Sequence, residues 1–209
     1  MTKTTWLWLI IGVIYLGFFS WYTSFGGPLT EEEIAYYLEA MQGDDAASPE
    51  AAARLRRFME EDTGDDFVMI NVIDMYDTPK QIEGVKPGET SSQVLDKYMA
   101  YMWPALLSRA SHPVIFGSAA NSAMDLMNAD GMEVWDTGAG MRYRSRRDML
   151  EIASNPAFSG SHEFKVAAMA KTIAFPIDPW FQLGDPRLVL GLLLGFIGTG
   201  LSWLFATRQ

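Results

Sequence analysis

The 209-residue chain contains no cysteine and only two histidines, His112 and His162. The absence of cysteine excludes disulfides, thiolate catalysis and cysteine-ligated metals, and the two histidines lack the close spacing that is typical of metal ligands. Basic residues are also few: the chain has 16 Lys and Arg and 26 Asp and Glu, which gives a formal net charge of −10. Nucleic-acid-binding proteins need a basic face, so we expect no nucleic-acid partner, no metal and no cofactor.

Charge is missing altogether from two apolar segments, residues 6–25 and residues 188–206. Each has about 20 residues, which is the length that an α-helix needs to cross a bilayer core of roughly 30 Å. Amphipathic aromatic rings are enriched where membrane helices meet lipid headgroups. The residues that we expect at this interface are Trp6, Trp21, Tyr22, Trp180 and Trp203. The sequence therefore predicts an integral membrane protein that has the lipid bilayer as a partner.

Two membrane spans would place both ends of the chain on the same side. Lys3 and Arg208 flank the two spans on that side, whereas residues 31–45 carry acidic side chains and no Lys or Arg. The positive-inside rule then predicts cytoplasmic termini and a central domain in the periplasm or outside the cell. A cleaved signal peptide is the alternative interpretation of the first segment, and its long apolar run with a single preceding lysine disfavours it.

Glycines recur at helical spacing in the second apolar segment. Gly191 and Gly195 form a GxxxG step, and Gly198 follows one turn later. Small residues at this spacing let two helix backbones approach closely in lipid. We expect these three glycines to form a packing face, either against the first helix or against a neighbouring subunit.

The central part of the chain predicts two further regions, a helical hairpin at residues 29–62 and an α+β domain at residues 65–178. The expected strands are residues 67–75, 113–118, 134–144 and 171–177. Helices are expected at residues 91–110 and from residue 145 onward, with interruptions at Pro156 and Gly160 before helical sequence resumes at residues 163–170. The order βαββαβ predicts a ferredoxin-like fold, in which helices cover one face of an antiparallel sheet. The other face would be bare, and stacking two sheets would bury it in a two-fold dimer or a higher homo-oligomer.

Residues 67–177 resemble the dimeric α/β-barrel superfamily, which includes antibiotic-biosynthesis monooxygenases. The likeness is nearest to a small uncharacterised family and rests on several short motifs of this chain. They are FVMINVIDM at 67–75, Tyr98 and Tyr101 leading into PALL at 104–107, EVWD at 133–136, YRSRRDM at 143–149 and Asn155-Pro156. The resemblance implies the ferredoxin-like fold, a two-fold dimer and a monooxygenase-like cleft between the sheet and its helices. The two membrane helices are additions to that family pattern.

Candidate catalytic residues are few. His162 is one first guess, because the pKa of an imidazole lies near neutrality and the group can act as a general base. Asn71 on the first strand and Arg142 on the third complete the set that a cleft would bring together. A structural role for each of them is the alternative, and no phosphate-binding loop, dinucleotide fingerprint or nucleophile elbow is present.

One basic cluster stands out in this acidic chain. Its members are Arg142, Arg144, Arg146 and Arg147. Cations at a helix N-terminus are disfavoured by the helix dipole, so partners are expected. Acidic groups of the hairpin, lipid headgroups and an anionic ligand are the open possibilities.

These patterns favour a membrane-anchored, self-associating protein that serves as an accessory or scaffolding subunit of a larger membrane complex, without catalysis of its own. The alternative is a monooxygenase-like enzyme or a small-ligand or quinone-binding protein. Such a protein would use the cleft of the α+β domain or the membrane-proximal residues 179–181.

Overall fold

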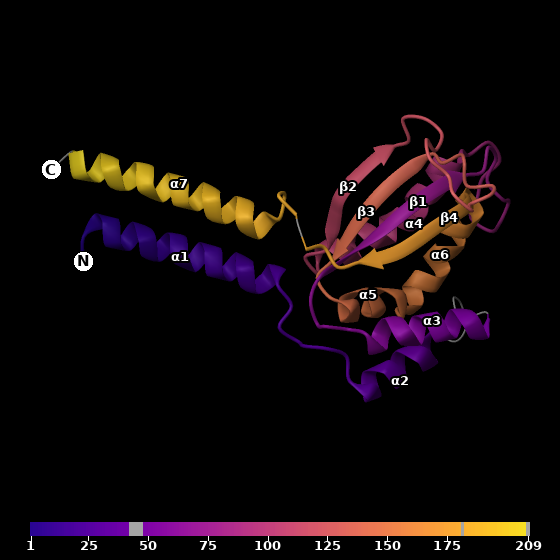
Figure 1. Ribbon diagram of the computed structural model, residues 1–209, viewed down its shortest axis with the longest axis horizontal. Coiled ribbons are helices and arrows are strands. Elements are labelled where there is room, and N and C mark those ends of the chain that lie inside the picture. The colour runs from indigo at the N-terminus through magenta and orange to yellow at the C-terminus, as the bar shows by residue number, and fades with distance from the viewer. Residues whose placement is uncertain (42–47, 181, 208–209) are drawn as a thin grey trace. The chain divides into compact units, whose positions relative to one another are not determined.

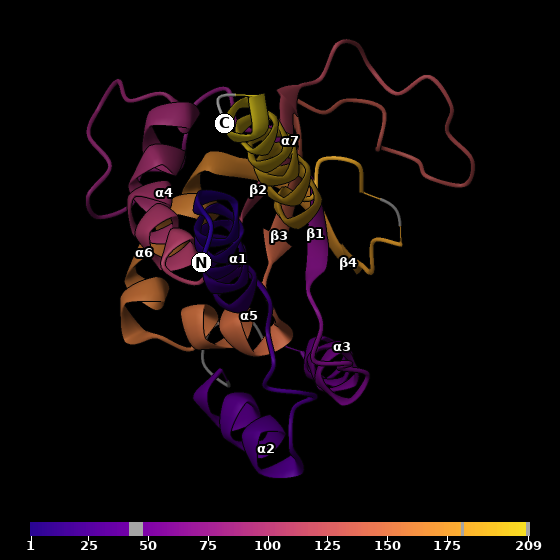
Figure 2. The same ribbon diagram turned by 90° about the vertical axis from the view of Figure 1, so that its left-hand side faces the viewer.

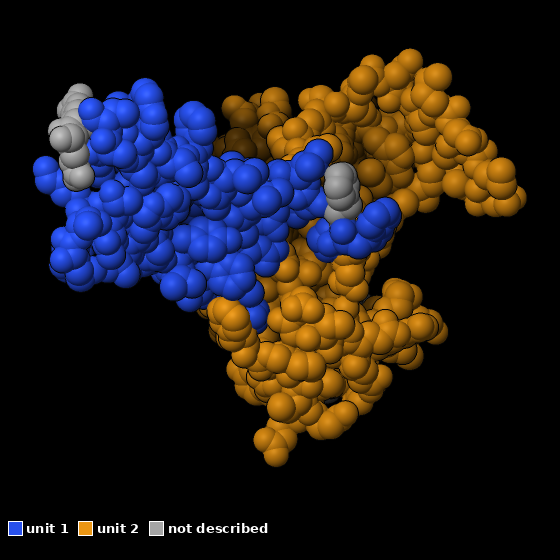
Figure 3. Space-filling model, turned by 60° about the vertical axis from the view of Figure 1, so that its left-hand side comes forward, with its two compact units in different colours: residues 1–24, 179–209 blue, residues 25–178 orange. Residues whose placement is uncertain are grey.

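A computed structural model describes residues 1–41, 48–180 and 182–207 of the chain. It contains two compact units, residues 1–24 with 179–209 and residues 25–178 (Figure 3). The helices are α1 (Lys3–Tyr22), α2 (Glu31–Ala40), α3 (Pro49–Glu60), α4 (Ser91–Leu107), α5 (Arg146–Ala153), α6 (Pro156–Ala168) and α7 (Pro186–Thr207). The strands are β1 (Phe67–Met75), β2 (His112–Ser118), β3 (Thr137–Tyr143) and β4 (Met169–Ile177).

The first unit holds the two apolar helices, α1 and α7, which lie side by side (Figure 1). Both are long and apolar enough to cross a membrane by length and composition. Helix α1 begins earlier than expected because the Thr2 hydroxyl caps it by accepting a hydrogen bond from the Thr5 amide. Helix α7 begins just after Asp185, whose carboxylate accepts a hydrogen bond from the Arg187 amide at 2.7 Å.

The four strands of the second unit form one antiparallel sheet in the order β2-β3-β1-β4. The elements follow in the order β1-α4-β2-β3-α5-α6-β4, and with α5 and α6 in the place of the second helix this is the ferredoxin-like βαββαβ fold expected from the sequence. Figure 2 shows α4 and α6 together on one side of the sheet. The buried side chains of the core between the layers are Phe67, Tyr98, Met102, Leu106, Tyr143, Ile152 and Phe158.

Several element boundaries differ from the sequence-based prediction. The predicted interruption at Pro156 is confirmed, because α5 ends at Ala153 and α6 starts at Pro156, where Pro fits the first helical position and the Asn155 side chain caps the helix. Gly160 lies inside the same helix, which ends at Ala168, so residues 169–170 belong to β4. Residues 134–136 lie outside β3 and belong to the long connection that precedes it.

The hairpin helices α2 and α3 are part of the second unit. Thr30 and Glu33 form the capping box that starts α2, and Ser48 with Pro49 starts α3. A second apolar cluster joins the hairpin to α5 and consists of Leu29, Ile34, Tyr37, Met41, Met59 and Leu150.

Candidate functional site

Within residues 25–41 and 48–178 of the second unit, no helix covers one face of the sheet. Side chains alternate along a strand, and those of Phe67, Met69 and Tyr143 pack toward the helices. The residues between them therefore point to the opposite side, which we call the open face. Its members are Val68, Ile70 and Val72 of β1, Gly138 and Gly140 of β3, Ile115 and Gly117 of β2, and Ile173, Phe175 and Ile177 of β4.

The open face carries large apolar side chains on both edge strands and two glycines on its β2–β3 side. Ile115 on the β2 edge is 66% exposed and Phe175 on the β4 edge is 47% exposed. Gly117 and Gly138 are paired across β2 and β3, and a Cβ atom added at either would meet nothing within 4 Å.

Ion pairs frame the open face at both ends of the sheet. Arg142, which shares a face with Val68, pairs with Asp66 at 2.8 Å. At the other end, the ammonium group of Lys171 lies 3.8 Å from the Asp74 carboxylate. The Lys171–Asp74 pair borders the exposed apolar side chains, as polar groups do at the rim of a protein–protein interface, whereas the Arg142–Asp66 pair is largely buried.

All four arginines of the basic cluster lie beside carboxylates of the same chain. Arg142 is only 1% exposed and donates hydrogen bonds to Asp66 and to the Ala110 carbonyl, both at 2.8 Å. Arg144 donates two hydrogen bonds to Asp148, at 2.7 and 2.8 Å. Arg142 therefore ties β3 to the segments that precede β1 and β2, and Arg144 ties the end of β3 to the first turn of α5.

Arg146 and Arg147 reach the hairpin. Arg146 donates to the Phe58 carbonyl and lies 3.6 Å from the Asp62 carboxylate. Arg147 donates two hydrogen bonds to Glu33 and contributes most to lowering the pKa of that carboxyl to about 2. Of the partners considered for this cluster, acidic groups of the hairpin are thus observed for two of the four arginines.

The two apolar helices contact each other through part of the expected glycine face. A Cβ atom at Gly198 would lie 2.8 Å from side-chain atoms of Trp8 and Ile11, and one at Gly191 would lie 3.3 Å from the Tyr15 ring. Gly195 has nothing within 4 Å of its Cβ position. The close approach therefore uses Gly191 and Gly198, two turns apart, and a hydrogen bond of 3.1 Å from the Trp8 indole to Ser202 supports it.

The aromatic residues expected at a membrane interface differ in their environment. Trp6, Trp21 and Trp203 are exposed, and Trp180 is 96% exposed. Tyr22 is buried, with the Arg187 guanidinium 5.4 Å from its ring centroid. Phe181 and Arg208, which also entered the sequence-based expectations, lie outside the described residues.

The three first-guess catalytic residues are on separate surfaces. Asn71 alternates with Val72 and so points toward the helices, where its amide donates to the Met69 carbonyl at 2.9 Å. Arg142 points to the other face of the sheet. His162 lies on α6, stacked on Phe158 with ring centroids 5.0 Å apart. The space between sheet and helices is filled by the apolar core, so these residues do not line a common cleft.

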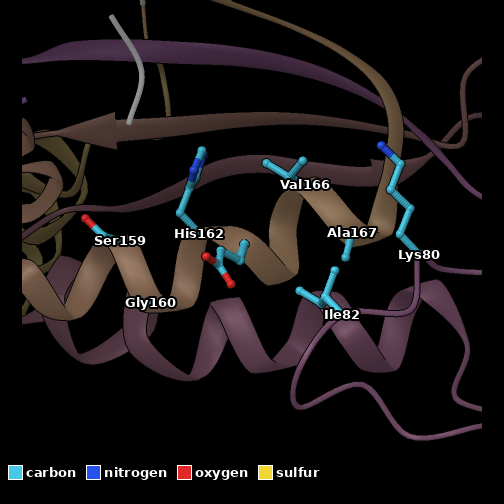
Figure 4. A pocket seen from close by; sticks show the side chains of 8 residues that line it. Lys80, Ile82, Ser159, Gly160, His162, Val166 and Ala167 are labelled. Atoms are coloured by element: carbon cyan, nitrogen blue, oxygen red, sulfur yellow. The ribbon is translucent and has the colours of Figure 1, made fainter. Parts of the chain in front are cut away.

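His162 does line a different pocket, of about 510 Å³, on the surface of α6 (Figure 4). The loop before α4 closes one side of it with Lys80 and Ile82, and the remaining lining residues are Ser159, Gly160, Glu163, Val166 and Ala167. This mixture of charged and apolar groups would suit a small amphipathic molecule. Sequence reasoning singled out His162 but missed Lys80, which lies more than 80 positions away and carries no motif.

Metal-ligand clusters of three or more His, Asp or Glu side chains are absent from residues 1–41, 48–180 and 182–207. His112 is engaged locally, with its Nδ1 atom 3.0 Å from the Pro113 carbonyl oxygen. The carboxylates with short contacts in the second unit face arginines, lysines and backbone amides. These contacts give the carboxylates structural roles in the fold.

No protein-family model matches the chain, and no curated protein does. Among solved structures, the chain is similar to the RPA0582 protein of unknown function from Rhodopseudomonas palustris, with 18% identity. That match has a TM-score of 0.51 and covers 67% of this chain and 99% of the other, and the methylated form of the same protein gives 0.53. At this identity the likeness establishes the fold alone.

Two further matches have lower scores. A dimeric protein of unknown function and ferredoxin-like fold from Bacteroides fragilis is 12% identical, with a TM-score of 0.32, and covers 55% of this chain and 96% of the other. A cofactor-independent oxygenase from Streptomyces nogalater, SnoaB, is 10% identical, with a TM-score of 0.33, and covers 58% and 99%.

Proposed function

We propose that the chain is a two-pass membrane protein whose ferredoxin-like domain self-associates and serves as a scaffolding subunit of a membrane assembly, without catalysis of its own. The observation that carries this proposal is the pair of uncharged helices, α1 and α7, packed on each other with most of their apolar side chains exposed. Exposed apolar surface on this scale is unfavourable in water and favourable in hydrocarbon.

Self-association would use the open face. Its exposed apolar side chains, Ile115 and Phe175 among them, have the composition of an interface, and we expect Phe175 of one copy to pack in the space over the Gly117–Gly138 pair of the other. A second copy related by a two-fold axis would bury both faces at once. Two stacked sheets lie about 10 Å apart, which leaves room for the side chains of both.

The orientation that we propose has both termini in the cytoplasm and the domain in the periplasm or outside the cell. The acidic hairpin supports this orientation, since the first charged residues after α1 are Glu31, Glu32 and Glu33 and positive charge is the determinant of the cytoplasmic side. Protease added to spheroplasts should digest the domain. Digestion of the domain only after the cells are lysed would show that the domain lies in the cytoplasm and would contradict the proposed orientation.

Purification of the native protein from its own membranes in mild detergent tests the scaffolding role. We expect a dimer or larger assembly that retains other membrane proteins after size-exclusion chromatography. A monomer that elutes alone would contradict it. A variant with Phe175→Asp provides the matched control, since it should keep the membrane location and lose the self-association.

The α6 pocket favours a second candidate function, the binding of a small amphipathic molecule. His162 and Lys80 offer polar contacts beside an apolar wall of Ile82, Val166 and Ala167. A ligand that co-purifies with the parent protein and is lost from a His162→Ala variant, as read by native mass spectrometry, would support this function. Equal retention by the variant would remove His162 from the site.

A further inference from the structure

The connection between β2 and β3, residues 119–136, is an extended arm. It is longer than most loops of compact domains, and loops of this length are often functional. Backbone hydrogen bonds of 2.8 Å, from Ala119 to Asp136 and from Ala123 to Glu133, hold its two limbs together. Its base is fixed to the sheet, because the Asp136 carboxylate accepts from the Met75 amide at 2.7 Å. The hydrogen bonds along the arm and at its base therefore give it a fixed conformation as it projects from the sheet.

The arm stands on the open-face side of the sheet. Lys171, whose partner across the strands is Asp74, belongs to that side. Its ammonium group donates to the Gly131 carbonyl at 2.7 Å and lies 4.8 Å from the centroid of the Trp135 ring. Figure 2 agrees, since the arm extends to the side of the sheet away from α4 and α6.

The tip of the arm is apolar and solvated. Met124 is 89% exposed and Met127 is 80% exposed, and Leu126 between them is also exposed. Unbranched methionine side chains adapt to irregular surfaces and are common at binding interfaces. Two carboxylates, those of Asp125 and Asp130, lie among them, and negative charge disfavours insertion between anionic lipid headgroups. These features favour a protein surface over a membrane as the occupant.

We propose that the arm clasps a second copy of this chain stacked on the open face, and that Met124, Leu126 and Met127 become buried against that copy. The stacked sheet would lie about 10 Å above the open face, within the layer into which the arm projects. Under two-fold symmetry, the arm of each copy would contact the other copy, so the dimer would contain two equivalent arm contacts. This inference rests on the proposed self-association and adds a second contact surface to it.

The self-association of the full chain in detergent, measured by sedimentation, tests the clasp. The double variant Met124→Asp with Met127→Asp should weaken association by about 10-fold or more, because each carboxylate would be desolvated at the interface. Val166→Asp is the matched control, since Val166 is exposed and apolar but lies on α6, on the other side of the sheet. Unchanged association of the double variant would overturn the clasp and leave the open-face dimer standing. A monomeric parent chain would overturn both.

Thiol labelling gives an independent readout, because the chain has no native cysteine. A Met124→Cys variant should react with maleimide about 10-fold more slowly at a concentration where the chain is dimeric than after dilution to monomer. A Val166→Cys variant should react at the same rate at both concentrations. Equal rates for Met124→Cys in dimer and monomer would overturn the inference.

Discussion

The guanidinium of Arg147 donates two hydrogen bonds to the carboxylate of Glu33, at 2.7 and 3.1 Å, and so joins α5 to the hairpin across more than 100 residues of sequence. The pair is partly exposed, and its contribution is screened by water. We expect Glu33→Gln to lower the free energy of unfolding by about 1 kcal/mol, since Gln keeps the capping box of α2 and loses only the charge. Glu32→Gln in the same helix turn is the control and should change stability much less in chemical denaturation.

The same pair predicts a pH dependence of stability. The pKa of Glu33 is about 2 in the folded protein against an ordinary value of 4.5, mainly because Arg147 donates to its carboxylate. A lowered folded-state pKa stabilises the protein above the unfolded value, and this stabilisation is lost as the pH falls from about 4.5 toward 2. The Glu33→Gln variant should therefore lose less stability than the parent between these pH values. Parallel acid unfolding curves would argue against the ion pair.

Arg142 is the most buried charge of the basic cluster, and its removal should be costly. Replacement by Leu would leave Asp66 without its guanidinium partner and the Ala110 carbonyl without a donor. Breaking a buried pair in this way costs about 3–5 kcal/mol. The double variant Arg142→Leu with Asp66→Leu removes both charges and should recover part of the loss. A single variant as stable as the parent in thermal unfolding would contradict the observed pairing.

The two helices of the first unit offer a matched pair of glycines. Leu at position 198 would collide with Trp8 and Ile11, whereas Leu at position 195 would enter open space. We expect Gly198→Leu to separate α1 from α7 and Gly195→Leu to leave them in contact. Crosslinking of cysteines introduced at positions 15 and 191 by a short bis-maleimide would report the contact in detergent, because the Cβ position of Gly191 lies 3.3 Å from the Tyr15 ring. Equal crosslinking in both variants would show that Gly198 is not at the helix interface.

Self-association through the open face depends on its projecting aromatic ring. We expect Phe175→Asp to weaken the dimer by about 2 kcal/mol or more, since the loss of a large aromatic anchor residue from an interface has effects of this size. Val166→Asp on α6 serves again as the control with equal added charge. If both variants sedimented like the parent, the open face would not be the site of association.

Much of the fold was predictable from the sequence, because the decisive signals are local. Strand β1 has the predicted bounds of residues 67–75, where apolar and β-branched residues dominate, and the βαββαβ order follows from such runs. The break before Pro156 was predicted correctly, but the helix resumes at Pro156 itself and continues through Gly160, because Asn155 caps it and Gly160 is tolerated inside a helix. Residues 134–136 have a composition typical of a strand, but β3 begins only at Thr137 and these residues form the base of the arm.

The candidate site was harder to predict, because it depends on contacts between distant residues. The pairing of Arg147 with Glu33 and the meeting of Lys80 with His162 join elements that no sequence spacing connects. Asn71 and Arg142 were grouped from composition, and strand alternation then placed them on opposite faces. Gly195 shares the GxxxG spacing with Gly191, yet the helix crossing brings Gly198 rather than Gly195 against α1.

Membrane integration is the premise of the proposed function, and alkaline carbonate extraction of membranes from cells that express the full chain tests it most directly. Two apolar helices held in hydrocarbon should keep the protein in the pellet after extraction and release it only with detergent. Recovery of the intact chain in the aqueous supernatant without detergent would contradict the account.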